Sequence, residues 1–120
     1  MNTSVPHFSP RNKRFPLLLC LAACSLASPL AHAKLKVVAT TPDFAAIAQE
    51  IGGDRVDVTS LAKPTEDSHF VDAKPSLILK LNRADVLIEG GAELEIGWLP
   101  SLMDSARNPK ILRGAPGNVM

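Results

Sequence analysis

The stretch LKVVATTPDFAAIAQEIGGDRVDVTSL, residues 35–61, predicts a strand, a helix and a second strand. Residues 35–39 form a continuous apolar run, which is typical of a strand covered on both faces. Thr41 can cap the helix, and the glycine pair that begins at Gly52 would end it. Residues 55–61 alternate between apolar and polar side chains, so we expect the second strand there.

The rest of the chain continues the alternation of strands and helices. We predict a loop, a helix, a strand, a second helix and a last strand at 62–74, 75–84, 86–88, 93–106 and 110–112. Pro100 should kink or divide the second of these helices, because proline cannot donate a helical hydrogen bond. The order β-α-β-loop-α-β-α-β predicts an α/β fold, a parallel sheet flanked by helices on both faces.

Residues 1–33 predict an export signal. Basic residues without acids precede the apolar stretch FPLLLCLAACSLASPLA, residues 15–31, and the Ala-His-Ala triplet that ends at Ala33 fits a signal-peptidase site. The central apolar run is shorter than the ~20 residues that a membrane-spanning helix needs. We therefore predict cleavage between Ala33 and Lys34, and a periplasmic domain over 34–120.

A second processing route remains open. Leu21-Ala22-Ala23-Cys24 resembles the lipobox of bacterial lipoproteins, in which Cys24 would be lipidated and would anchor the protein to the membrane. Cleavage after Ala33 is preferred because a strand-like run begins at Leu35 and leaves no spare tether. Both cysteines of the chain lie in the leader, so the mature part would have neither a disulfide nor a cysteine metal site.

The composition of residues 34–120 narrows the classes of function. Ten lysines and arginines stand against twelve acids, a net charge of −2, which excludes the usual basic surface for nucleic acid. No G-x-S-x-G, P-loop or H-E-x-x-H motif occurs, so we predict no enzyme activity. Glu93 and Glu95 are expected to be solvated, and Trp98 is expected in the core.

The loop PTEDSHFVDAKPS, residues 64–76, is the candidate metal site. His69 lies there with three carboxylates that could hydrogen-bond its ring without binding the metal themselves: Glu66, Asp67 and Asp72. Neutral imidazole is the commonest ligand for transition metals, and a carboxylate often holds its second nitrogen. Imidazole favours zinc, with manganese as the alternative. From residue types alone, a surface histidine in an acidic loop is the commoner case, and a closed zinc site needs four ligands.

Three stretches of the sequence occur together in a characteristic order: KLKVVATTPDFAAIAQEIGGDRVDVTSL, PTEDSHFVDAKPS and LNRADVLIEGGAELEIGWLPSL. Over residues 34–113 the chain closely resembles the N-terminal lobe of the zinc and manganese solute-binding proteins of bacterial ABC importers. In that family a long helix joins two α/β lobes, and the metal lies between the lobes. The resemblance implies an exported metal carrier, which we expect to be a monomer, and an ABC permease in the inner membrane as its partner.

The same resemblance assigns His69 as a metal ligand. The family's first ligand is a histidine in a pattern like P-x-x-D-x-H-x-x-x-x-x-P-S, which here runs from Pro64 to Ser76. The remaining family ligands fall beyond this chain, so we expect residues 34–120 to be an N-terminal lobe, truncated before the linking helix and the second lobe. The alternative function is a lipid-anchored surface binding or adhesion module of the same fold, without a transport role.

Overall fold

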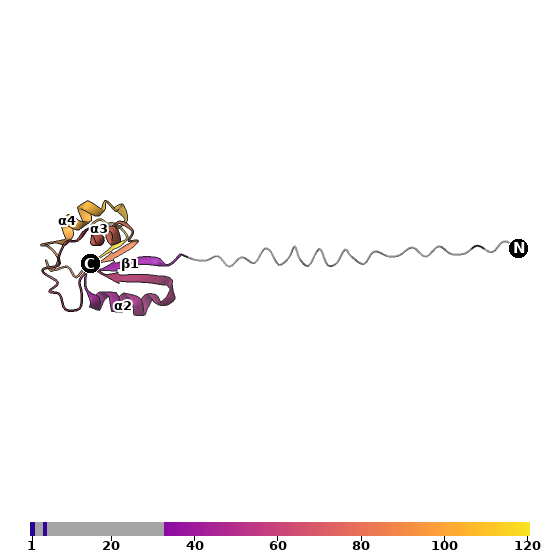
Figure 1. Ribbon diagram of the computed structural model, residues 1–120, viewed down its shortest axis with the longest axis horizontal. Coiled ribbons are helices and arrows are strands. Elements are labelled where there is room, and N and C mark those ends of the chain that lie inside the picture. Colours follow the sequence, from indigo (N-terminus) through magenta and orange to yellow (C-terminus); the bar gives the residue numbers. More distant parts are fainter. Residues whose placement is uncertain (2–3, 5–32) are drawn as a thin grey trace. The chain divides into compact units, whose positions relative to one another are not determined.

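The computed structural model, which describes residues 1, 4 and 33–120, contains a parallel sheet with helices on both faces (Figure 1). This confirms the predicted α/β architecture. The elements in chain order are β1 (Leu35–Ala39), α2 (Pro42–Gly52), β2 (Val56–Ser60), α3 (Pro75–Asn82), β3 (Val86–Ile88), α4 (Leu99–Ala106) and β4 (Asn118–Val119). Short 3₁₀ turns follow α2 and α4, at Gly53–Arg55 and Pro109–Ile111.

The four strands lie in the order β2-β1-β3-β4, and every pair is parallel. Val38 of β1 lies opposite Thr59 on one side and Leu87 on the other. The chain therefore winds outward from β1 in both directions, and the strand order reverses between β1 and β3. In open sheets of this kind, ligands bind outside the carboxyl ends of the strands at such a reversal.

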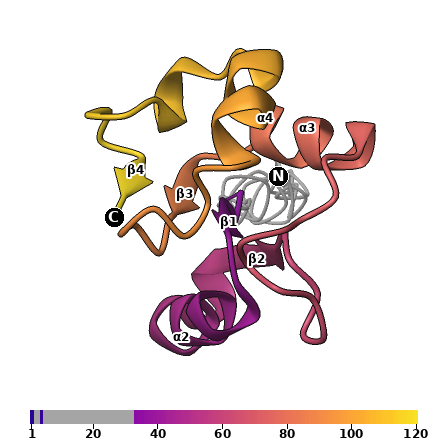
Figure 2. The ribbon, with the colours of Figure 1, turned by 90° about the vertical axis from the view of Figure 1, so that its left-hand side faces the viewer.

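Helix α2 covers one face of the sheet, and α3 and α4 cover the other (Figure 2). Pro42 occupies the first turn of α2, and the N–H of Phe44 donates to the Thr41 hydroxyl at 3.5 Å, as the sequence predicts for a capped helix start. No residue of α2 is fully buried, and Ile47 and Ile51 are exposed. The helix therefore contributes less to the core than its apolar pattern suggests.

The main hydrophobic core lies between the sheet and the α3–α4 pair. Val38 and Leu87 supply it from the sheet, and successive residues of a strand point to opposite faces, so Val37 and Ala39 face α2. Trp98 is 4% exposed and belongs to this core, as predicted. The remaining members are Leu61, Ala62, Val71, Leu77, Leu81, Ala84, Leu99, Leu102, Met103, Ala106 and Ile111.

Two predicted elements near the carboxyl end are wrong in extent or type. The helix predicted at 93–106 begins only at Leu99: Glu93 adopts a positive φ of 66°, residues 94–97 form turns, and Trp98, with a φ of −141°, lies outside the helical region. Pro100 does not kink this helix. It lies in the first turn, where the backbone N–H groups have no helical partner in any case.

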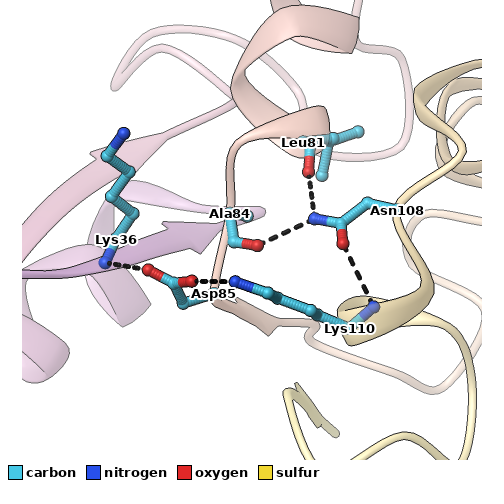
Figure 3. Close-up of polar contacts among 6 residues, drawn as sticks. All are labelled: Lys36, Leu81, Ala84, Asp85, Asn108 and Lys110. Atoms are coloured by element: carbon cyan, nitrogen blue, oxygen red, sulfur yellow. Dashed lines mark hydrogen bonds and ion pairs between the residues drawn. The ribbon is translucent and has the colours of Figure 1, made fainter.

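The strand predicted at 110–112 is a 3₁₀ turn, and the last strand is β4. Asn108 explains the difference: its Oδ1 accepts from the N–H of Lys110 at 3.1 Å, which starts the turn (Figure 3). Its Nδ2 donates to the carbonyls of Leu81 and Ala84 at 2.8 and 2.7 Å, at the end of α3. Both carbonyls lie at or just beyond the end of α3, so the buried amide ties α3 to the segment that leads into β4.

Asp85 connects the start of β3 to two other segments (Figure 3). Its Oδ1 lies 2.6 Å from Nζ of Lys110, and its Oδ2 accepts from the N–H of Lys36 at 3.0 Å. The hydrogen bond from Lys110, followed by that from Lys36, holds the pKa of the Asp85 carboxyl below its ordinary value of 3.8. A lowered carboxyl pKa stabilises the fold above the ordinary value, and that stabilisation is lost as the pH falls through the folded-state pKa.

We expect Asp85→Asn to destabilise the protein slightly at neutral pH, by less than about 1 kcal/mol, because an amide still accepts from Lys36 but loses the ion pair. The difference from the wild type should shrink as the pH falls below 3.8 and vanish below the lower folded-state pKa, where the folded carboxyl is protonated as well. Urea unfolding at several pH values measures it. Asp104→Asn, at an exposed acid of α4, is the control. A constant difference across all pH values would contradict the prediction.

The predicted export signal, residues 1–33, lies outside the described residues except at positions 1, 4 and 33, and the possible lipidation site, Cys24, lies outside them altogether. Both routes of processing therefore stay predictions. Within the part of the chain that the structure describes, no helix is both long enough and apolar enough to cross a bilayer.

Candidate metal centre

The candidate site is the loop between β2 and α3, which leaves the carboxyl end of the sheet. Directly after β2, the N–H of Leu61 donates to the carbonyl of Ala39 at 2.9 Å, so the chain continues alongside β1 for a short distance. Two turns then shape the loop: Glu66 N–H bonds the Lys63 carbonyl at 3.0 Å, and Phe70 N–H bonds the Asp67 carbonyl at 2.9 Å. The second turn contains His69 and presents it at the surface.

His69 and Asp67 form the central contact of this loop. Oδ1 of Asp67 lies 2.9 Å from Nδ1 of the His69 ring, and the same oxygen accepts from the His69 backbone N–H at 2.9 Å. The His69 side chain is 61% exposed. Because the carboxylate engages Nδ1, the second ring nitrogen, Nε2, is the one that remains available to a metal from solvent.

The hydrogen bonds from His69 stabilise the ionised form of the Asp67 carboxyl. The backbone hydrogen bond from His69, followed by the contact with its ring, lowers the pKa of Asp67 below the ordinary value of 3.8. The carboxyl is therefore ionised at neutral pH. A carboxylate that holds the far nitrogen of a histidine orients the ring and makes the ligating nitrogen more basic, which favours metal binding.

The two other predicted carboxylates do not contact the ring. Oε2 of Glu66 accepts from the Lys63 N–H at 3.1 Å, and Oδ2 of Asp72 lies 3.3 Å from Nζ of Lys74. Among the described residues, no three histidine, cysteine, aspartate or glutamate side chains come together as a metal cage. The site in this part of the chain is therefore one imidazole with one carboxylate partner, and the metal role of all four residues stays a prediction.

Glu95 occupies the point where the strand order reverses. Its Oε1 accepts from the Thr40 hydroxyl at 2.6 Å, beyond β1, and from the N–H of Gly90 at 2.8 Å, beyond β3. The prediction that Glu95 is solvated is wrong, since this residue is only 4% exposed. Its buried carboxyl is satisfied by the two hydrogen bonds that it accepts from Thr40 and Gly90. A protein side chain thus fills the crevice between β1 and β3, and the candidate site lies farther out, at the loop.

Trp98 is a second residue whose polar role the sequence does not reveal. Its indole Nε1 donates to the carbonyl of Ser68 at 2.9 Å, so a core side chain contacts the residue directly before His69. The only signal for such a contact is the indole N–H itself, which needs a partner when tryptophan is buried.

Two hollows flank these residues. One, of about 370 Å³, lies beside the loop and is lined in part by Asp43, Lys63, Glu66 and Ser68. The other, of about 430 Å³, lies near β4 and is lined by several acids, among them Glu89; His69 lines neither hollow. Since imidazole is the preferred ligand of zinc in this residue set, the loop of His69 is the better candidate for a transition metal.

A family model and a curated relative both match most of this chain. The family model described as "Zinc-uptake complex component A periplasmic" matches residues 37–116. The manganese ABC transporter substrate-binding lipoprotein PsaA of Streptococcus anginosus is 33% identical over 98 residues, which are 78% of this chain and 32% of that protein. The chain thus spans about a third of the length of this curated relative.

Solved structures agree with this likeness. The crystal structure of ZnuA aligns with a TM-score of 0.58 and 26% identity over 63% of this chain and 30% of its own. The periplasmic zinc binding protein TroA from Treponema pallidum aligns with a TM-score of 0.57 and 25% identity, over 64% of this chain and 27% of its own.

Proposed function

The chain belongs to the family of periplasmic zinc-uptake complex component A, and from this membership we propose that it is the metal-capturing N-terminal lobe of an ABC importer's solute-binding protein. Capture by such a lobe breaks and forms no covalent bond, so the proposed role is binding and delivery to a membrane permease. The names of the relatives mention manganese and zinc, and many of them are called lipoproteins.

The observation that carries this proposal is the pairing of His69 with Asp67. Nδ1 of the ring is engaged by the carboxylate at 2.9 Å, and the exposed ring can offer Nε2 to an ion at the carboxyl edge of the sheet. The metal is the cargo in this proposal, with zinc as the first candidate and manganese as the second. One imidazole leaves most of the coordination sphere to water or to other protein groups, so we expect this chain alone to bind zinc weakly.

Export follows from the leader, and the relatives' names add weight to lipidation at Cys24 as the route of anchoring. A lipid anchor would hold the lobe at the membrane surface, next to a permease. The alternative function, an adhesion module of the same fold, uses the same anchor but needs no metal at His69.

A metal titration of the full chain separates the two functions. We expect zinc and manganese to perturb the backbone amide signals of residues 64–72 in ¹⁵N NMR spectra, and magnesium, which prefers an all-oxygen site, to leave them unchanged. Cys20→Ser and Cys24→Ser should be introduced so that the leader thiols do not compete for zinc. A loop that is indifferent to zinc and manganese at millimolar concentration would favour the adhesion module.

A further inference from the structure

The peptide unit between Ser68 and His69 is held from both of its sides. Its carbonyl, that of Ser68, accepts from Nε1 of Trp98 at 2.9 Å. Its N–H, that of His69, donates to Oδ1 of Asp67 at 2.9 Å. Because a peptide unit is planar, two hydrogen bonds at opposite edges fix its orientation and thereby the direction in which the His69 side chain leaves the backbone.

Trp98 is the rigid one of these two partners. It is 4% exposed and lies in the main core, whereas the side chain of Asp67 is 60% exposed. The backbone N–H of Trp98 bonds the carbonyl of Glu95 at 3.2 Å, and the Glu95 carboxyl is itself bonded to the ends of β1 and β3. The position of the indole is therefore set by the sheet.

Burial holds the loop at Val71, which is 6% exposed and lies in the core, but not at residues 69 and 70. The His69 side chain is 61% exposed, and the next residue, Phe70, is 80% exposed. A Cβ placed on Gly97 would lie 3.7 Å from the carbonyl oxygen of His69, an ordinary contact distance, so the chain before Trp98 runs alongside the loop. Hydrogen bonds to this neighbouring segment must supply the order that burial does not.

We propose that Trp98 is the positioning residue of the metal site: its indole N–H anchors the Ser68 carbonyl to the core and so presents the His69 ring in the orientation that binds the ion. This role rests on the proposed function of His69. Trp98 touches no metal itself. Trp98 would restrict the conformations of His69 before the metal binds. His69 then loses less conformational freedom on binding, and the affinity for the metal is higher.

Trp98→Phe tests the proposal, because phenylalanine keeps an aromatic ring in the core but removes the N–H donor together with part of the indole volume, and the second change is what a core control must account for. In the full chain with both leader cysteines replaced by serine, we expect zinc affinity at the loop amides to fall by about three- to tenfold. Leu102→Val is the matched control: it removes a methylene from the same core, at a position 2% exposed, and should leave zinc affinity unchanged. Equal affinity in wild type and Trp98→Phe would overturn the proposal, and so would an equal loss in Leu102→Val.

A measurement without metal tests the positioning role of Trp98 independently of whether His69 binds a metal. In Trp98→Phe the order parameter of the His69 amide should fall toward the value of about 0.6 that marks flexible backbone, while Leu102→Val keeps it at the wild-type level. If zinc fails to bind at His69 in the wild type, the proposed function fails, and an unchanged order parameter then overturns the positioning role independently.

The wild type supplies a further readout, which needs no variant to fold. Trp98 is the single tryptophan of the chain, so its indole N–H gives one isolated NMR signal. If Trp98 orders the loop for zinc, zinc must in turn strengthen the indole bond, since coupling between two events is reciprocal. We expect zinc to slow the exchange of this N–H with solvent. Exchange that zinc leaves unaltered, while the loop amides respond, would contradict the proposal.

Discussion

Replacing Glu95 with alanine is expected to destabilise the protein by about 2–4 kcal/mol, because the substitution leaves one buried hydroxyl and one partly buried N–H without an acceptor. The Thr40 hydroxyl, 2.6 Å away, and the Gly90 N–H, 2.8 Å away, both donate to the same carboxyl oxygen. Thr40 is fully buried, so water cannot readily replace that oxygen. Urea unfolding, followed by circular dichroism, measures the loss as a lower midpoint with an unchanged slope.

Glu95→Gln is the matched control for this prediction. The amide oxygen of glutamine can accept both hydrogen bonds and fills nearly the same space, so we expect a loss of less than about 1 kcal/mol. If alanine and glutamine destabilised the protein equally, the carboxyl group and not the two hydrogen bonds would be the important feature, and the role assigned to Glu95 at the end of the sheet would be wrong.

The order of the first elements could be predicted because hydrophobic pattern and local signals agree there. Residues 35–39, apolar apart from Lys36, form strand β1 in the interior of the sheet, and Thr41 and Gly52 mark the ends of α2 as expected. The loop over 62–74 also follows directly from its prolines and acids, which interrupt any regular period. At the start of α2, a capping residue and a proline in the first turn both indicate the same helix boundary, and the structure has the boundary there.

The predictions near the carboxyl end failed where long-range contacts decide the backbone. Ile111 is apolar and buried, but it belongs to a turn that Asn108 caps and not to a strand. The hydrogen bonds from the Asn108 amide to the end of α3 cannot be predicted from the local sequence pattern. Glu95 resembles a solvated helix acid in sequence, yet its partners are 55 and five residues away. A buried polar group is specified by its partners, which only the fold brings together.

The contact between His69 and Asp67 agrees with the sequence prediction, whereas the surroundings of His69 differ from it, and the metal role of these residues stays a prediction. His69 lies at the carboxyl edge of the sheet, where topology places ligands, and Asp67 is two residues from it and contacts it directly. Glu66 and Asp72 are as close in sequence but bond Lys63 and Lys74 instead. The indole of Trp98 reaches the loop from 30 residues away, a contact that no local pattern indicates.

His69→Ala is the substitution with the largest expected effect on binding. It removes the one imidazole of residues 33–120, and the neighbouring carboxylates alone are weaker and less selective ligands for zinc. We expect the zinc affinity of the loop to fall by more than about tenfold, since even the loss of an outer partner of a ligand costs that much. His32→Ala, at the histidine next to the predicted cleavage site, is the control and should change nothing at the loop.

The direct test is a zinc titration of the full chain in three forms, wild type, His69→Ala and His32→Ala, each with serine at positions 20 and 24 and each followed by the amide signals of residues 64–72. If the exposed imidazole at the end of β2 coordinates the ion, only the form with alanine at position 69 loses its response. If that form shifts its loop signals at the same zinc concentrations as the wild type, then His69 is not the metal ligand.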